Sequence, residues 1–395
     1  MDILKLDNKG RGICYVDDKI TFVENALAGE DVDIKITNSK SKFNEAQVIK
    51  YNKLSDDRIK VNCPYYNECG GCEILHLKEE KELEFKKDKV KAILKKFGDI
   101  DFNIKDITSL DMHNYRNKAT FHVNNDVGYF KRKSNNIVSI NNCLIVDNRI
   151  NDILKEIKKL NLKNIEEFVV RTTKNDTMLI IKCIGPIDPR FKELNITSII
   201  KCLNGEYETV KGLDYITEEI DGFKFVISPN SFFQVNTSCM IKLYNQVVEY
   251  SNLKGSEKVL DLYCGTGTIG IYLSRYADSV LGIEINKSAI DDAIINKKIN
   301  HIRNIDFICS DASDICEKDF NLVVVDPPRS GLSEKTINYL LDLNPNKIVY
   351  VSCDPVTLAC DLKKLKEMYN IKDIKLFNMF PRTEHVETVC LLERR

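Results

Sequence analysis

The chain has 395 residues, of which 43% are hydrophobic and 30% charged, as in globular proteins with enough material for two or three domains. The net charge of −1 gives no global attraction to nucleic acid, so RNA binding would need a local basic surface. The start MDILKLDNKG is no signal peptide and no long apolar run follows, which predicts a cytoplasmic protein without a membrane span. In such a chain its 14 cysteines are expected to be metal ligands, a nucleophile or small buried hydrophobes.

Residues 1–53 contain four or five short predicted strands, among them GICYV, KITFVENAL, EDVDIKIT and EAQVIKY. Turn residues such as Asp17-Asp18 and Ala28-Gly29-Glu30 separate them. So many short strands in so few residues predict a small barrel of the oligonucleotide-binding type. Such a barrel either contacts RNA or serves only as a structural lid.

The next stretch, CPYYNECGGC, holds Cys63, Cys69 and Cys72 within ten residues. Three thiols are an incomplete metal site, so a fourth ligand is expected from elsewhere in the chain. Gly70-Gly71 would let the loop wrap closely around a bound group. Spacing alone leaves zinc and an iron–sulfur cluster equally open.

Residues 77–97 predict a highly charged helix, whose alternating charges are typical of a solvated face. After it, YRNKATFHV and GYFKRKSNNIV predict a strand pair in which basic and aromatic residues alternate. Cations beside aromatic rings suit phosphate contact with base stacking, although a basic solvent edge is the alternative. The candidate RNA contacts are Arg116, Lys118, Phe121, Lys131, Arg132 and Lys133.

From about residue 240 apolar strands alternate with helices, which predicts a doubly wound α/β sheet covered on both faces. DLYCGTGTIG, residues 261–270, places Gly265 and Gly267 where the first strand turns into a helix. The pattern suits a dinucleotide or S-adenosylmethionine. Glu284 ends the second strand, where it would contact ribose hydroxyls of either ligand. VVVDPPRSG places Asp326 at the same edge, followed by a loop stiffened by two prolines.

VYVSCDPVTLACD places Cys353 at the end of a strand and near a helix start, a position expected to favour a thiolate. A thiolate that adds to C6 of a pyrimidine makes C5 nucleophilic enough to accept a methyl group. A general base must then remove the C5 proton, and FPRTEHVETVCLL offers Glu384, His385 and Glu387 without deciding among them. Cys264 and Cys360 are expected to be packing residues.

Seven motifs carry a resemblance that covers essentially the whole chain: CPYYNECGGC, YRNKATF, SPNSFFQVN, LDLYCGTGTIG, DPPRSGL, YVSCDPVTLACDL and HVETV. They resemble the class I S-adenosylmethionine-dependent RNA (uracil-C5)-methyltransferases, in the branch with an iron–sulfur cluster and a TRAM domain. The resemblance implies Cys353 as nucleophile and Glu387 as base. It implies methyl-donor contacts by Gln234, Tyr263, Glu284 and Asp326, and Phe232 and Phe233 either against a flipped base or in the core. Asp354 stands where many relatives have asparagine.

The resemblance also implies a four-iron, four-sulfur cluster on Cys63, Cys69, Cys72 and Cys143, architectural or an aid to RNA binding. The expected domains are a TRAM-like β-barrel (1–55), a central α+β domain with the cluster (56–235) and a Rossmann-like methyltransferase domain (236–395). The expected function is methylation of uridine C5 in 23S rRNA by a monomer that binds neither DNA nor membrane. The alternatives are tRNA methylation, a non-catalytic RNA-binding ribosome-assembly factor and a dinucleotide oxidoreductase.

Overall fold

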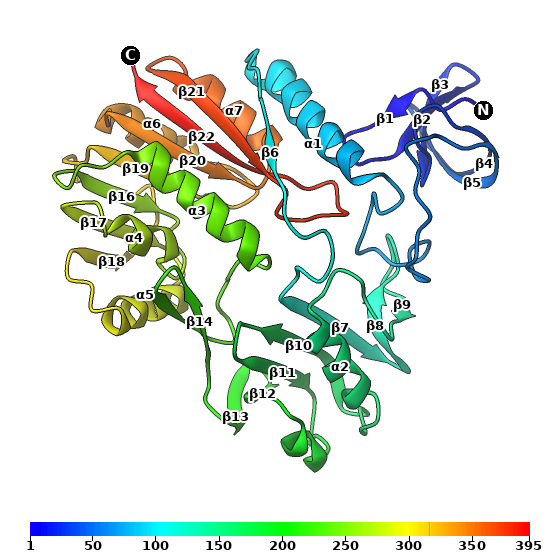
Figure 1. Cartoon of the computed structure of the whole chain (residues 1–395), viewed down its shortest axis with the longest axis horizontal. Helices are drawn as coiled ribbons and strands as arrows, with labels where there is room; N and C mark the ends of the chain where they lie inside the picture. Colours follow the sequence, from blue (N-terminus) through cyan, green and yellow to red (C-terminus); the bar gives the residue numbers. More distant parts are fainter. Residues whose placement is uncertain (316) are drawn as a thin grey trace.

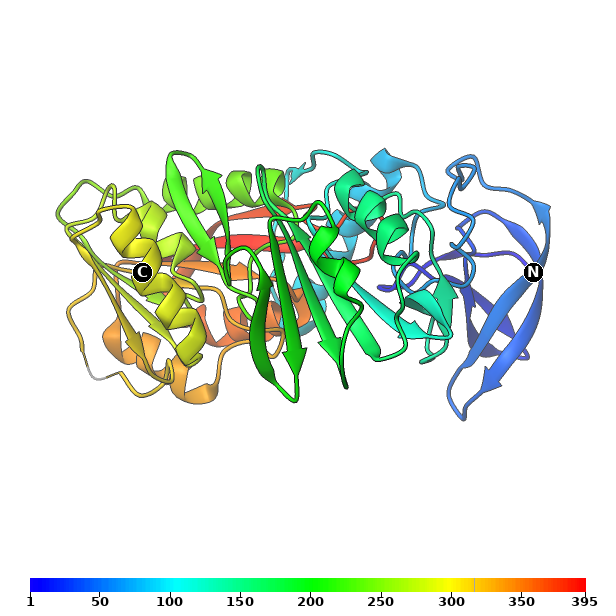
Figure 2. The ribbon, with the colours of Figure 1, turned by 90° about the horizontal axis from the view of Figure 1, so that it is seen from below.

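The computed structural model describes residues 1–315 and 317–395. The described residues form an N-terminal, a central and a C-terminal sheet and a two-stranded hairpin, whose arrangement Figure 1 shows. In the view of Figure 2 the N-terminal sheet lies at one end of an elongated molecule, the central sheet in the middle and much of the C-terminal sheet at the other end. Among the described residues, no helix is long and apolar enough to cross a membrane.

The N-terminal sheet has the strand order β1-β2-β3-β5-β4. A bridge between Asp2 and Asp31 joins the two ends of this order and closes it into a barrel. Cys14, at 2% exposure, is a small hydrophobe in the barrel core, as expected for a cysteine without chemistry. The predicted strands are confirmed as β1 (Lys5–Leu6), β2 (Gly12–Val16), β3 (Lys19–Glu24), β4 (Asp31–Ser39) and β5 (Asn44–Lys53).

The central sheet has the order β13-β12-β11-β10-β7-β8-β9, and helix α2 (Asn148–Ile157) packs against β10. The predicted basic strand pair is confirmed as β7 and β8, which are antiparallel neighbours. A short helix, η2 (Pro189–Glu193), precedes β12. The strands are β7 (Lys118–Asn124), β8 (Asp126–Phe130), β9 (Ile137–Ser139), β10 (Ile165–Thr172), β11 (Thr177–Cys183), β12 (Ser198–Leu203) and β13 (Glu206–Lys211).

The C-terminal sheet has the order β18-β17-β16-β19-β20-β22-β21-β6. The first five are parallel, whereas β22 is antiparallel to both β20 and β21. Its strands are β16 (Lys258–Leu262), β17 (Ser279–Glu284), β18 (Ile305–Cys309), β19 (Leu322–Val325), β20 (Lys347–Ser352), β21 (Tyr369–Phe377), β22 (Glu387–Arg394) and β6 (Ile107–Thr108).

Helices cover both faces of this sheet, which confirms the predicted doubly wound α/β architecture. One face packs against α3 (Thr237–Ser251), α4 (Thr268–Leu273) and the hairpin of β14 (Ile216–Ile220) and β15 (Phe223–Ile227), against which α5 (Lys287–Ile299) also packs. The other face packs against α6 (Glu334–Leu343), α7 (Pro355–Leu365), α1 (Glu79–Ile93) and its extension η1 (Leu94–Gly98). Helix α1, although early in the chain, is thus part of the C-terminal core.

The expectation that the charges of residues 77–97 are solvated is wrong for one face of α1. Glu82 and Lys86 are completely buried and form an ion pair with a separation of 2.9 Å between Nζ and Oε1. Because Glu82 and Lys86 are four residues apart, they lie on the same side of the helix. That side faces the loop between β21 and β22, a contact that local charge patterning could not reveal.

Candidate active site

The candidate catalytic residues gather at one edge of the C-terminal sheet. Glu284 ends β17, Asp326 follows β19 and Cys353 follows β20. The strand order β17-β16-β19-β20-β22 makes these strand ends neighbours, and the antiparallel β22 starts there with Glu387. In open α/β sheets this carboxyl edge is where ligands bind.

The glycine loop between β16 and α4 is shaped by positions that only glycine tolerates well. Gly267 has φ +78° and caps α4, and a Cβ there would lie 2.5 Å from a ring carbon of Phe307. Gly265 has φ +55° and open space where a side chain would be. Its N–H donates to Oε2 of Glu284 over 3.2 Å, so the glycine loop and the acid of the second strand are held together.

Two other residues predicted to contact the methyl donor, Tyr263 and Gln234, are held in place by hydrogen bonds to neighbouring elements. Tyr263 takes up a left-handed backbone conformation, φ 63°, and its hydroxyl is 3.2 Å from Oγ1 of Thr336. Gln234 is nearly buried, and its carbonyl accepts a hydrogen bond from Asn117 Nδ2 over 3.1 Å. The motif YRNKATF thus fastens the segment SPNSFFQVN, in which Phe233 is buried and Phe232 is 69% exposed.

The register of β20 and β22 brings the predicted nucleophile and base together. Ser352 pairs with Thr388 in this antiparallel ladder. Cys353 and Glu387 are the residues next to this last pair, and the carboxylate of Glu387 contributes to the raised pKa of the Cys353 thiol. Asp354 caps α7 by accepting from the N–H groups of Val356 and Thr357, at 2.8 and 3.2 Å, a role that asparagine would also fill.

Burial dominates the electrostatics of this edge. It raises the pKa of Glu387 to about 8 and that of Asp326 to about 7, and Asp326 adds like-charge repulsion to Glu387. Asp261, which is completely buried below the glycine loop, has its pKa raised to about 8 by burial and then by Asp326. The edge is therefore a group of acids that resist ionisation and that would be stabilised by a cation.

The expectation that Cys353 sits in surroundings that favour a thiolate is wrong for the protein by itself. Burial raises the pKa of the Cys353 thiol to about 12, and the carboxylates of Glu387 and Asp326 add to the rise. The guanidinium of Arg329 acts in the opposite direction but does not outweigh them. The start of α7 therefore lowers the thiol pKa by less than burial and the two nearby acids raise it.

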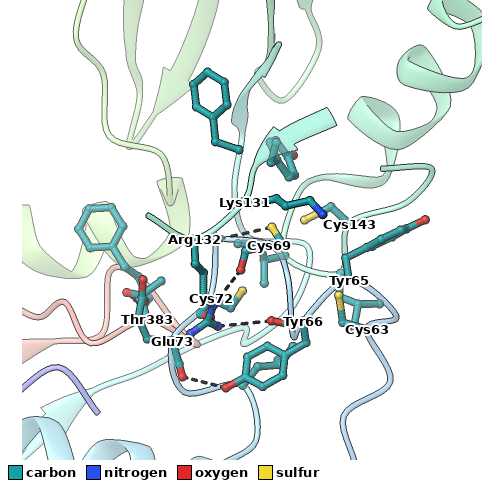
Figure 3. A pocket seen from close by; sticks show the side chains of 18 of the residues that line it. Cys63, Tyr65, Tyr66, Cys69, Cys72, Glu73, Lys131, Arg132, Cys143 and Thr383 are labelled. Atoms are coloured by element: carbon teal, nitrogen blue, oxygen red, sulfur yellow. Dashed lines mark hydrogen bonds between the residues drawn. The ribbon is translucent and has the colours of Figure 1, made fainter. Parts of the chain in front are cut away.

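The four predicted cluster ligands line one cavity of about 800 Å³, which Arg329 and His385 also line. Figure 3 shows the thiols of Cys63, Cys69, Cys72 and Cys143, with Arg132 beside Cys69 and Cys72. The cysteine loop (residues 63–74) and the segment after β9 meet here, so the distant fourth cysteine is brought beside the first three. Burial raises the pKa of these thiols.

The prediction of a metal site is not supported by the positions of these thiols. Within residues 1–315 and 317–395, no group of three or more His, Cys, Asp or Glu side chains is arranged to hold a metal ion. The four cysteines therefore share a cavity without converging on a point that a single ion could occupy.

The residues of the predicted RNA-binding strand pair differ in exposure and in how far they are bonded within the protein. Phe121 is wrong as a stacking residue, because it has no exposed surface and stacks inside the core on Tyr129, with ring centroids 5.0 Å apart. Strand alternation points this ring inward. Phe130, at 38% exposure, is the outward aromatic of the pair.

The basic residues of the strand pair are largely bonded within the protein. Arg132 donates to the carbonyl oxygens of Cys69, over 3.0 Å, and Cys72, so it secures the cysteine loop. Lys131 pairs with Glu68, Lys133 with Glu24 and Glu45, and Arg116 donates to the carbonyl of Lys118 over 3.0 Å. Lys118 has its pKa lowered to about 8, chiefly by burial. Their contact with RNA stays a prediction.

Arg329 was not selected from the sequence, although it stands in the quoted DPPRSG motif. It is exposed at the catalytic edge, lies 3.4 Å from His385 between Nη2 and Nε2, and lowers the pKa of both Cys353 and Glu387. A cation directly after the DPP turn is the only sequence signal that could have identified it.

Comparison with known proteins shows which class of protein this chain belongs to. The model of the tRNA (uracil-5-)-methyltransferase family matches residues 193–318 and 311–395, and the TRAM domain model matches residues 2–49. A protein described as an uncharacterized RNA methyltransferase of Clostridium tetani is 34% identical, over 99% of this chain and 95% of its own. A similarly described protein of Clostridium acetobutylicum is 36% identical, over 98% and 95%.

A solved structure, the tRNA (uracil-54, C5)-methyltransferase of Pyrococcus abyssi in complex with S-adenosyl-L-homocysteine, has a TM-score of 0.85 and 29% identity. The match covers 99% of this chain and 98% of that one. The fold is therefore that of a Rossmann-like methyltransferase with an N-terminal TRAM domain. The chain belongs to the RNA (uracil-C5)-methyltransferase family, and the enzyme class expected from the sequence is confirmed.

Proposed function

We propose that the protein methylates C5 of a uridine in RNA with S-adenosylmethionine, with Cys353 as nucleophile and Glu387 as general base. The observation that carries this proposal is the β20–β22 register, which pairs Ser352 with Thr388, the chain neighbours of Cys353 and Glu387, at the ligand-binding edge. A pyrimidine ring between the thiol and the carboxylate would present C6 to the sulfur and the C5 proton to the carboxylate.

In the proposed reaction the Cys353 thiolate forms a bond to C6, and the ring electrons move to C5. The bound donor would supply an electrophilic methyl group on a positively charged sulfur, whose charge also favours ionisation of the acids around it. C5 takes this methyl group as the bond between the methyl carbon and the donor sulfur breaks, which leaves S-adenosylhomocysteine. Glu387 then takes the C5 proton, the C5–C6 double bond forms again and the C6–sulfur bond breaks. Cys353 is thereby released as a thiolate, and Arg329 stabilises the anionic groups.

We assign donor binding to the loop and acids that line the same edge. Gly265 and Gly267 leave the backbone accessible, and Glu284 is placed to accept hydrogen bonds from ribose hydroxyls. The remaining assignments follow the family resemblance, and the homocysteine complex of the archaeal neighbour supports the choice of donor. The proposed donor-binding residues are Gln234, Tyr263, Glu284, Asp326, Gly265 and Gly267.

For the RNA substrate we favour 23S rRNA, on the resemblance to the branch that combines a TRAM domain with the cysteine motif. tRNA is the second candidate, because the archaeal neighbour is named for a tRNA position and matches nearly the whole chain. We assign the barrel of residues 1–55 and the central sheet of residues 56–235 to RNA binding. Residues 236–395 are assigned to methyl transfer, together with the proposed donor contact Gln234 and with α1 and the β14–β15 hairpin, which pack with the C-terminal sheet, in a protein that acts as a monomer.

For the four cysteines we propose a four-iron, four-sulfur cluster. The donor set fits, because four thiols surround one cavity. A tetrahedral zinc ion would need all four sulfurs about 2.3 Å from one point. A four-iron, four-sulfur cluster is likewise held by four cysteine thiolates, and the family resemblance favours it over zinc. Cluster binding would also favour loss of the thiol protons, whose pKa values are raised.

The test of the reaction uses transcripts in which 5-fluorouridine replaces uridine, because fluorine at C5 cannot leave as a proton. Wild-type protein with donor should give an RNA–protein adduct that survives a denaturing gel, and Cys353→Ala should give none while binding RNA normally. Mass-spectrometric mapping of 5-methyluridine in rRNA and tRNA, with and without the gene, decides between the two substrates. Methylation by Cys353→Ala would reject the proposed chemistry.

The cluster has a separate test. Protein purified without oxygen should be brown and contain about four iron and four sulfide per chain. The Cys143→Ser variant should lose iron, whereas the Cys360→Ser variant, whose cysteine is exposed on α7, should keep it. A colourless wild-type protein with one zinc per chain would reject the cluster.

A further inference from the structure

The segment that leads to Glu387, residues 378–386 between β21 and β22, is bonded to other elements along its backbone. Four of its carbonyl oxygens accept hydrogen bonds from side chains of other elements. The carbonyl of Met379 accepts from Asn236 Nδ2 over 3.2 Å and that of Phe380 from Lys86 Nζ over 3.0 Å. The carbonyl of Pro381 accepts from Tyr115 Oη over 2.9 Å and that of Glu384 from Lys89 Nζ over 2.8 Å. Irregular loops usually bond to solvent. This segment is instead held by α1, by the start of α3 and by the residues before β7.

Within this segment, Arg382 forms hydrogen bonds through both its backbone and its side chain. It is 2% exposed, although it is an arginine, and has a left-handed backbone conformation with φ 69°. Its N–H donates to Oε1 of Glu82 over 2.9 Å. Its guanidinium donates to Oε1 of Glu79 over 2.8 Å and to the carbonyl of Leu77 over 3.2 Å.

The carbonyl of Arg382 links the same segment to the cysteine loop. It accepts from the N–H groups of Glu73 and Ile74, at 3.1 and 3.2 Å. One residue therefore fastens the approach to Glu387 to both α1 and the cysteine loop. Neither contact reaches the methyl donor or the proposed nucleophile, so Arg382 touches none of the reacting groups.

Four residues separate Arg382 from Glu387, and they are constrained as well. Oγ1 of Thr383 donates to the carbonyl of Phe380 over 2.8 Å, and Val386 is fully buried in the C-terminal core. A change at Arg382 is therefore passed along a short, fixed path to the first residue of β22. Proton abstraction depends steeply on where the base stands, and a shift of about 1 Å can slow such a step about 100-fold.

We propose that Arg382 is a positioning residue for proton abstraction by Glu387, acting through the bonds of its guanidinium to Glu79, Glu82 and the carbonyl of Leu77, in a segment that its backbone also bonds to the cysteine loop. The inference rests on the proposed function, since it takes Glu387 as the base. It predicts that loss of Arg382 affects the step in which the C5–H bond breaks and leaves the preceding C6–sulfur bond formation and methyl transfer nearly unchanged.

The test compares Arg382→Met with the wild type on RNA that carries uridine or [5-²H]uridine. Turnover of Arg382→Met should fall about 100-fold, with a larger deuterium isotope effect than in the wild type, because C5–H cleavage becomes rate-limiting. The rate of adduct formation on 5-fluorouridine RNA should stay within about twofold, because that substrate never reaches proton abstraction. Arg382→Lys, which keeps a cation, should recover part of the turnover.

Two controls keep the outcomes separate. Glu84→Gln alters an exposed ion pair with Lys81 on another side of α1 and should behave as the wild type. If Arg382→Met fails to fold, Arg382→Lys carries the same isotope comparison. Equal losses in adduct formation and turnover, or an unchanged isotope effect, would overturn the positioning role. The proposed function itself would fail by a different result, which is methylation by the Cys353→Ala variant. The Arg382 variants do not bear on that result.

Discussion

Two groups of buried charges lie next to each other in this protein and are built in opposite ways. At the catalytic edge, Asp261, Asp326 and Glu387 neighbour one another, and burial raises the pKa of all three. On the face of α1, Lys86 lies between Oε1 of Glu82, at 2.9 Å, and Oδ1 of Asn378, at 2.6 Å. One group concentrates acids, and the other matches each charge with a partner.

The difference indicates what each group is for. Buried like charges destabilise the folded state, so they persist where a ligand or reaction uses them. Buried charges with complete sets of partners contribute little net stability compared with apolar residues, but removing one partner is very unfavourable because the other stays buried and unpaired. We therefore expect substitutions at the catalytic edge to change activity or pH dependence, and substitutions on α1 to change stability.

The largest expected effect at the catalytic edge is that of Glu387→Gln. Loss of the base should slow release of methylated RNA by about 10²–10⁴-fold, while the covalent adduct still forms and accumulates with ordinary uridine. Quench and gel electrophoresis of single-turnover reactions would measure both. Glu384→Gln is the matched control, because Glu384 pairs with Lys89 and should not be needed for the reaction. If Glu384→Gln accumulated the adduct instead, the base would be misassigned.

On α1 the corresponding experiment is Lys86→Met. Removal of this cation leaves Glu82 buried without one of its partners and should lower the free energy of unfolding by about 3–5 kcal/mol. Urea denaturation at neutral pH would measure it. Lys81→Met, in the exposed pair with Glu84, should change stability by less than about 1 kcal/mol. Similar small values for both variants would contradict the distinction drawn between the paired and exposed charges.

Most of the fold was predictable, because alternating apolar strands and helices specify a doubly wound sheet and short strands with turn residues specify the barrel. The catalytic positions were predictable for the same reason, since Asp326 and Cys353 follow apolar strands whose ends meet. Glu387 was different. Its place near Cys353 depends on β22 being antiparallel and on its register, which spacing alone does not define and which the family resemblance supplied.

The wrong predictions have a common physical cause. A local pattern of charged or aromatic residues does not reveal which distant parts of the chain pack against it. Glu82 and Lys86 were expected in solvent because their partners are about 300 residues away in the sequence. Phe121 was expected outside because it stands among cations, yet strand alternation turns it inward. The thiol pKa of Cys353 was misjudged because it is raised by burial and then by acids that come from other strands.

The acids of the catalytic edge should also make stability depend on pH, and Asp261→Asn tests this. The pKa of Asp261 is about 8 in the folded protein and near its ordinary value when unfolded, so the folded state binds more protons between these values. Stability should therefore fall as pH rises from about 4 to 8. Asparagine does not titrate, so unfolding measured at several pH values should show a flatter curve, with the variant more stable by a few kcal/mol at pH 9. If the stability of the variant changed with pH in parallel with that of the wild type, the raised pKa of Asp261 would be contradicted.

The smallest expected effect is that of Arg329→Gln, the cation that offsets the acids at the same edge. Glu387 must be ionised to accept a proton, so activity should rise with pH through a limb near the pKa of about 8. Because Arg329 lowers the pKa of Glu387, its removal should move this limb to higher pH, by less than about one unit since the guanidinium is exposed and screened. The shift should shrink with added salt, whereas Lys335→Gln on α6 should leave the limb in place. A limb that stays in place or moves to lower pH would mean that Arg329 does not lower the pKa of Glu387.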